Sequence, residues 1–136
     1  MDATDSIRRA STLIYRALVL GQTIAWAAGT VFLRFVLRQP RGLLAAVSVG
    51  RVLAILSIVG LGAGLVTYVR GPKTDVGTRR GTVILTWACF QAAGLLAWLG
   101  YISSGEGICF AAGVMSLVLM HAFGPGRLRN TGERAA

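Results

Sequence analysis

Four long apolar blocks constrain this chain more than any other feature of its sequence. They cover residues 13–33, 52–69, 82–102 and 107–123, and their only basic side chains are Arg16 and His121. A helix needs roughly 20 predominantly apolar residues to cross the hydrocarbon core of a membrane. The first three blocks meet this requirement, and the fourth lies near its lower limit. The sequence therefore predicts an all-α integral membrane protein, a four-helix bundle made of two transmembrane hairpins.

The composition argues against a soluble helical bundle. Only 14% of the residues are charged, against about 25% in a typical soluble domain. Helices of a soluble bundle carry a polar stripe, whereas these blocks are apolar all round. A cleaved signal peptide is a second alternative for the first block, but its apolar run continues to Leu37 with only Arg34 interrupting it. That run is too long for the apolar region of a signal peptide.

Turn-forming residues divide the chain into its expected elements. Pro40 is expected to end the first helix, and the Gly, Pro and Asp residues of 70–81 predict a loop. We expect a single transmembrane domain over residues 1–136. Its expected parts are helices at about 13–37, 43–69, 82–102 and 107–123, a short head at 1–11 and a polar tail at 124–136.

The basic residues predict the orientation of the four spans. Ten of the 14 Lys and Arg residues fall on the side of the two termini and the 70–81 loop, and the other four fall on the opposite side. The excess places both termini in the cytoplasm, in an inner or plasma membrane. A net charge of +9 could also indicate nucleic acid, but these arginines flank apolar helices. We therefore expect anionic membrane lipids as partners, and no nucleic acid.

Small residues recur along one side of two expected helices. Ala17, Gly21, Ala25 and Gly29 follow one another at intervals of four, and Gly60 and Gly64 do the same in the second helix. Small side chains let two membrane helices approach closely. Such stripes pack either within the bundle or against other membrane subunits or copies of this chain, and the sequence leaves both open.

Two glutamines are the polar side chains deepest in the apolar blocks. Gln22 lies in the first expected helix and Gln91 in the third. An amide in hydrocarbon seeks a partner on another helix, which contributes about 0.6 to 2 kcal/mol. We expect both to face the bundle interior, where they either bond each other or line a small polar cavity.

Arg51 is a permanent charge about one turn inside the outer end of the second expected helix. Three interpretations are open. Its long stem can carry the guanidinium out to the headgroups. It can form an ion pair with Glu106, the sole outer carboxylate, or it can bind the phosphate of a lipid or a substrate.

Chemistry for catalysis is sparse. The five acidic residues all lie outside the middle of the expected spans. The chain is similar in size and helix number to the small multidrug-resistance transporters, and that resemblance implies an embedded glutamate in the first helix; residues 13–37 contain no carboxylate, so the resemblance is limited to size. His121, the only histidine, lies about 140° around the helix from Ser116, so the two form no nucleophile–base pair.

The two cysteines, Cys89 and Cys109, have no metal-ligand spacing, and they are expected near opposite membrane faces. We expect no catalytic residue, cofactor or metal. The predicted function is that of a non-catalytic accessory, assembly or scaffold subunit of a membrane complex. The alternatives are a minimal oligomeric transporter or channel for a small solute, and a lipid-binding protein.

Overall fold

The chain folds into four helices over the residues that the structure describes. The computed structural model describes residues 3–36, 47–71 and 76–125, and in these ranges it contains no strand. The helices are α1 (Ala3–Val31), α2 (Val47–Arg70), α3 (Val76–Ser104) and α4 (Gly107–Ala122), and a single π-helical segment, η1 (Phe32–Val36), continues α1. This confirms the prediction of an all-helical four-helix bundle.

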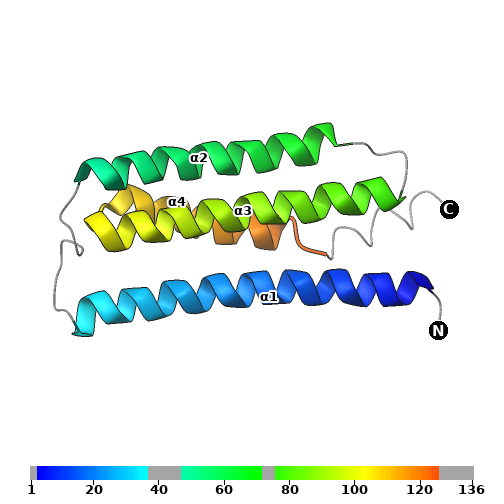
Figure 1. Cartoon of the computed structure of the whole chain (residues 1–136), viewed down its shortest axis with the longest axis horizontal. Coiled ribbons are helices and arrows are strands. Elements are labelled where there is room, and N and C mark those ends of the chain that lie inside the picture. Colours follow the sequence, from blue (N-terminus) through cyan, green and yellow to red (C-terminus); the bar gives the residue numbers. More distant parts are fainter. Residues whose placement is uncertain (1–2, 37–46, 72–75, 126–136) are drawn as a thin grey trace.

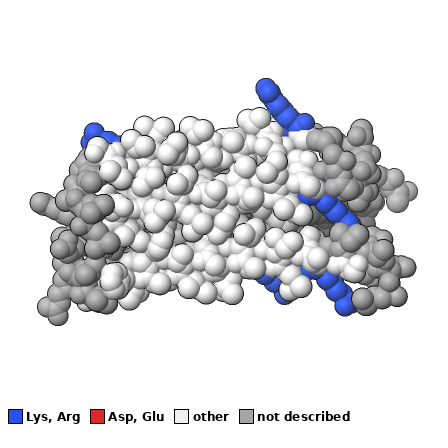
Figure 2. Space-filling view, viewed as in Figure 1, with Lys and Arg blue, Asp and Glu red and all other residues white. Residues whose placement is uncertain are grey.

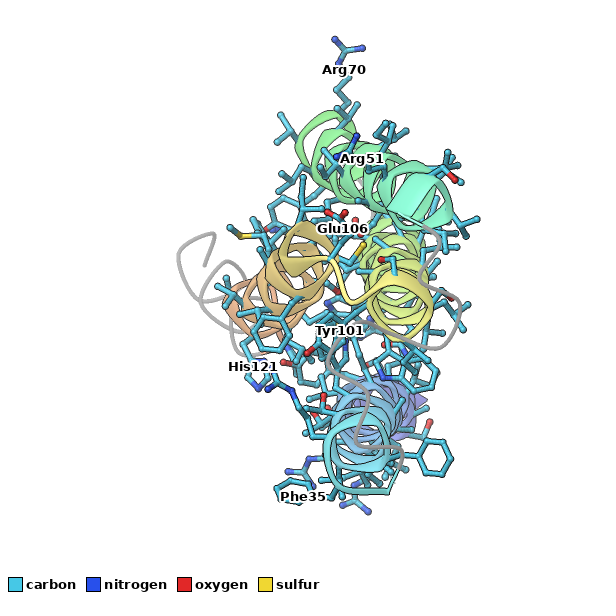
Figure 3. All side chains as sticks on the ribbon, turned by 90° about the vertical axis from the view of Figure 1, so that its left-hand side faces the viewer. Phe35, Arg51, Arg70, Tyr101, Glu106 and His121 are labelled. Atoms are coloured by element: carbon cyan, nitrogen blue, oxygen red, sulfur yellow. The ribbon has the colours of Figure 1, made fainter. Side chains whose placement is uncertain are left out.

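The helices lie parallel to one long axis and alternate in direction. α1 and α3 run the same way, and α2 and α4 run the opposite way (Figure 1). Viewed from one end, α3 and α4 form a central pair, with α2 on one side of it and α1 on the other (Figure 3). The most extensive contact joins α2 to α3, and α1 contacts α3 and, more sparsely, α4.

This arrangement corrects the predicted pair of hairpins. α3 and α4 do form a tight hairpin, closed by Gly105 at a positive φ of 71°. α1 and α2, however, make no extensive contact, because the α3–α4 pair lies between them. α2 packs on α3 because Gly60 and Gly64 have no side chain that would hold the two helices apart. This close contact with α3 takes the place of the predicted contact with α1.

Two helix boundaries also differ from the prediction. α1 begins at Ala3, ten residues before the predicted start, so most of the expected head at 1–11 is helical. α3 begins at Val76, inside the expected loop at 70–81. A polar helix end continues until a breaker stops it, and no proline interrupts either extension. The expected end of the first helix at Pro40, the start of the second at 43–46 and the tail beyond 125 lie outside the described residues.

Burial is inverted relative to a soluble protein. Among the described residues, half of the eight largest fully buried side chains are polar, namely Gln22, Ser57, Thr86 and Ser116. Large aliphatic side chains are exposed instead, for example Ile55 (60%), Val59 (62%) and Val118 (55%). On the face shown in Figure 2, the described surface across the middle is uncharged, and the basic side chains lie toward the ends. Soluble proteins rarely expose apolar surface of this extent.

Length and composition support a membrane span for two of the helices. Ser48–Arg70 and Arg79–Ser104 are long and apolar enough to cross a membrane. α4 is apolar but has only 16 residues, about 24 Å. α1 does not meet the same criterion, because Arg16, Gln22 and Thr23 interrupt its apolar sequence. The prediction of four spans is therefore supported in part.

Candidate functional site: a polar seam between α1 and α3

Polar and aromatic side chains gather where α1 meets α3. On α1 they are Tyr15, Gln22 and Trp26, with Gly29 beyond them; on α3 they are Trp87, Gln91, Gly94, Trp98 and Tyr101. Steps of three, four and seven residues place each set on one face of its helix. Contacts between Tyr15 and Trp87, between Gln22 and Gly94, and between Gly29 and Trp98 show that the two faces meet. We call these nine residues the α1–α3 seam.

Gln22 lies at the centre of the seam and is fully buried. Its Nε2 donates to Ser116 Oγ of α4 over 2.9 Å, and Ser116 Oγ donates to the carbonyl oxygen of Phe90 in α3 over 2.7 Å. Gly94 makes room for this bridge, because a Cβ there would lie 2.6 Å from Ser116 Oγ and collide with the Gln22 amide. One short chain of hydrogen bonds thus joins three helices.

Two of the three seam tryptophans, Trp26 and Trp98, fit against glycines of the facing helices. The indole of Trp26 lies over Gly113 of α4, where an added Cβ would overlap the ring. It also stacks on Tyr101, with ring centroids 5.9 Å apart. In the same way, a Cβ on Gly29 of α1 would lie 2.5 Å from Trp98 Nε1. Tyr101 lies between α1 and the α3–α4 pair (Figure 3).

Four buried polar atoms of the described residues have no hydrogen-bond partner: Gln22 Oε1, Gln91 Oε1, Trp26 Nε1 and Trp98 Nε1. All four belong to the seam. The orientation of the Gln22 amide follows from its neighbours, since Ser116 gives its one proton to Phe90 and must accept from Gln22. The Gln22 oxygen is therefore the free atom, and it is an acceptor.

The bond between the two glutamines, one of the two alternatives that the sequence left open, does not form. Both amide oxygens are unpartnered, so neither glutamine accepts a proton from the other. The partner of Gln22 is instead Ser116 of α4, a pairing that the sequence does not predict. A hydroxyl in the middle of the most apolar helix was the available signal. His121 itself is exposed, and its Nδ1 lies 2.9 Å from the carbonyl oxygen of Leu117.

The seam also closes the C-terminal end of α4. The hydroxyl of Tyr15 donates to the carbonyl oxygen of Met120 over 3.1 Å, and Trp87 Nε1 donates to that of Phe123 over 2.8 Å. The last carbonyl groups of a helix have no partner within the helix. Tyr15 and Trp87 satisfy two of them from neighbouring helices, which suits a short helix that ends inside the bundle.

The structure places Arg51 and Glu106 at the same end of the bundle (Figure 3). Arg51 is exposed, and Glu106 is half-buried just before α4. A Cβ on Gly50, the residue before Arg51, would lie 3.4 Å from Glu106 Cγ. Within the described residues no ion pair joins the two side chains. The three interpretations of Arg51 stay predictions.

The expected packing stripes divide into two groups. A Cβ on Gly60 would lie 3.2 Å from that of Ala93, and one on Gly64 would meet Phe90, so both glycines pack against α3. Ser57 adds a hydrogen bond of 2.8 Å to the carbonyl oxygen of Ala93. Gly21, by contrast, is exposed, and no atom lies within 4 Å of its added Cβ. Ala25 is half-buried.

Among the described residues, no three His, Cys, Asp or Glu side chains gather in a way that suits a metal ion. Cys89 packs against Gly64, and Cys109 Sγ lies 3.2 Å from the carbonyl oxygen of Gly50, nearer the other end of α2.

Comparisons with protein-family models, with curated proteins and with solved structures find no match to this chain.

Proposed function

We propose that this chain is an integral membrane protein whose four helices all lie in the bilayer. The observation that carries the proposal is the inverted burial: hydroxyl and amide groups are buried, while Ile, Val and Leu cover the outside. In lipid the aliphatic surface needs no cover, whereas polar groups must find partners inside the protein. α1 joins the two longer helices through the seam on α3, and α4 joins them through its contacts with α3 and α2.

The distribution of basic residues supports an orientation with both termini in the cytoplasm. Five arginines whose side chains the structure describes lie toward the end of the bundle that holds the start of α1 and the end of α4: Arg9, Arg16, Arg70, Arg79 and Arg80. Only Arg34 and Arg51 lie toward the other described end. Each basic group near the surface of a membrane attracts anionic lipids by about 1 kcal/mol.

The role that we propose is non-catalytic association with other membrane helices, as an accessory, assembly or scaffold subunit. The outer face of α1 supports it. Ala17, Gly21 and Ala28 are exposed at spacings of four and seven residues, so they share one side of the helix. None of the described helices covers Gly21. A small-residue face of this kind lets another helix approach closely.

Native mass spectrometry after mild-detergent extraction from the source membrane tests this role. We expect stoichiometric foreign subunits or a defined number of copies of this chain. Gly21→Leu is expected to remove them, because its side chain would hold the partner helix away. Gly62→Leu is the matched control: Gly62 is exposed on α2, again with no atom within 4 Å of an added Cβ. A wild-type chain that is always monomeric, or a loss that is equal in both variants, would refute the proposed role.

A second candidate function is the passage of a small uncharged solute through the oligomer or the bundle. The unpartnered polar atoms of the seam favour it, because they lie in succession within an apolar bundle. Solute flux into proteoliposomes tests this function directly. Flux that equals that of empty liposomes would eliminate the candidate.

A further inference from the structure

The unpartnered atoms of the seam follow one another along the bundle axis. Gln22 and Trp26 lie on successive turns of α1, about 6 Å apart along its axis. The indole nitrogen of Trp98 lies against Gly29, less than one turn beyond Trp26. Gln91 precedes Gly94 on α3, and thus lies on the opposite side of Gln22 from Trp98. Acceptor and donor groups therefore follow one another at successive levels along the bundle axis, and we call them the row.

The chemistry of this row specifies its complement. Gln22 Oε1 and Gln91 Oε1 need a proton donor, whereas Trp26 Nε1 and Trp98 Nε1 need an acceptor. A hydroxyl group supplies both, since it donates one proton and accepts through its lone pairs. Gln22 and Trp26 are at least nine-tenths buried, so bulk solvent does not reach them.

The row also selects for an uncharged molecule. The nine residues of the seam and Ser116 are all neutral. A buried ion needs a countercharge or a full set of polar ligands, which these residues do not provide. Buried waters typically make about three hydrogen bonds to polar groups that otherwise have no partner.

We propose that the α1–α3 seam is a binding site for neutral hydroxyl groups, either of water or of a small polyol, held between the oxygen of Gln22 and the indole N–H groups of Trp26 and Trp98. Ser116 is the positioning residue, because its hydrogen bond turns the Gln22 oxygen away from α4 and leaves it free to accept. The site adds hydrogen bonds between α1 and the α3–α4 pair to the close contacts of Trp26 with Gly113 and of Trp98 with Gly29.

The three tryptophans of the chain provide an internal comparison for the test. Trp87 Nε1 already donates to Phe123, whereas Trp26 and Trp98 have no partner. The experiment is proton-detected NMR of the full chain with ¹⁵N-labelled tryptophan in lipid nanodiscs, with cross-relaxation recorded from water to the indole N–H groups. A membrane-impermeant paramagnetic chelate is added to suppress signals from groups that bulk water reaches.

We expect water cross-peaks at Trp26 and Trp98 that persist with the chelate, and none at Trp87. After glycerol is added, cross-peaks to its carbon-bound protons would identify a polyol as an occupant, whereas an unchanged spectrum would identify water alone. If Trp26 and Trp98 show no more cross-relaxation than Trp87, the seam is dry and the proposal is wrong. Cross-peaks to lipid acyl protons in place of water would overturn it as well.

A pair of variants tests the role of the Gln22 oxygen. Gln22→Leu keeps the size of the side chain, and we expect it to remove the water cross-peak of Trp26. Thr86→Val is the matched control, because Thr86 is buried on α3 but donates to Thr82 of its own helix. It should keep the cross-peak. If Gln22→Leu does not fold, the comparison of the three wild-type tryptophans still decides the proposal.

Discussion

Ser116 shows how much one hydroxyl group connects in this protein. It accepts a hydrogen bond from Gln22 of α1 and donates one to α3, while its own backbone belongs to α4. Ser116→Ala would leave the Gln22 amide nitrogen and the Phe90 carbonyl oxygen buried without that partner. We expect a loss of about 1 to 2 kcal/mol in the free energy of unfolding, measured by denaturant titration in mixed micelles.

Ser103 supplies the control at the same scale. Its hydroxyl donates to Leu99 within α3 and touches no other helix through that bond. Ser103→Ala is therefore expected to change the free energy of unfolding by less than about 0.5 kcal/mol. Equal effects of the two substitutions would mean that the bridge between the three helices contributes nothing of its own.

At the scale of elements, α4 depends on its neighbours for its end. With 16 residues it stops level with Tyr15 and Trp87, and these side chains bind the carbonyl oxygens of Met120 and Phe123. Tyr15→Phe removes one donor and keeps the ring. We expect hydrogen–deuterium exchange in the last turn of α4 to accelerate roughly five-fold, which corresponds to the loss of about 1 kcal/mol for one hydrogen bond.

Tyr68→Phe is the matched control for the exchange experiment. The ring of Tyr68 packs against Phe123 with centroids 4.6 Å apart, but its hydroxyl makes no hydrogen bond to the described residues. It should leave the exchange of α4 unchanged. Acceleration of the same size in both variants would point to general loosening of the aromatic contacts, not to the loss of a capping bond.

For the whole molecule, the proposed orientation in a membrane can be tested directly. We expect a single cysteine at Ala10, near the start of α1, to react with an impermeant maleimide only after the cells are opened. A cysteine at Ser103, next to the turn between α3 and α4, should react in intact cells. Both are placed in a chain with Cys89→Ala and Cys109→Ala, since the two native thiols are free and could also react with the maleimide.

The reversed labelling pattern would contradict the orientation inferred from the arginines, although not the bundle itself. Labelling of both positions from outside would contradict the bundle, because the structure places Ala10 and Ser103 at opposite ends. The basic residues toward the end with Arg9 and Arg80 give the physical reason for the expected result.

The sequence was sufficient for features that depend on local composition. The apolar blocks predicted four helices, because length and hydropathy alone decide whether a segment forms a buried or lipid-facing helix. In the last hairpin α3 ends at Ser104 and α4 begins at Gly107, which differs from the predicted boundaries by at most two residues. The starts of α1 and α3 were wrong, since a polar helix end carries no hydropathy signal.

Partners across helices required the tertiary structure. The sequence identified Gln22 and Gln91 as the deepest polar groups and left open whether they bond each other or line a polar cavity, but it did not associate Gln22 with Ser116. Which side chains meet depends on the rotation and axial register of every helix, and these are set by contacts such as Gly113 against Trp26. Linear spacing fixes which residues share one helix face, so the sequence by itself determined the faces. Only packing decided that α1 lies against α3 and not α2, because close approach is a property of two surfaces together.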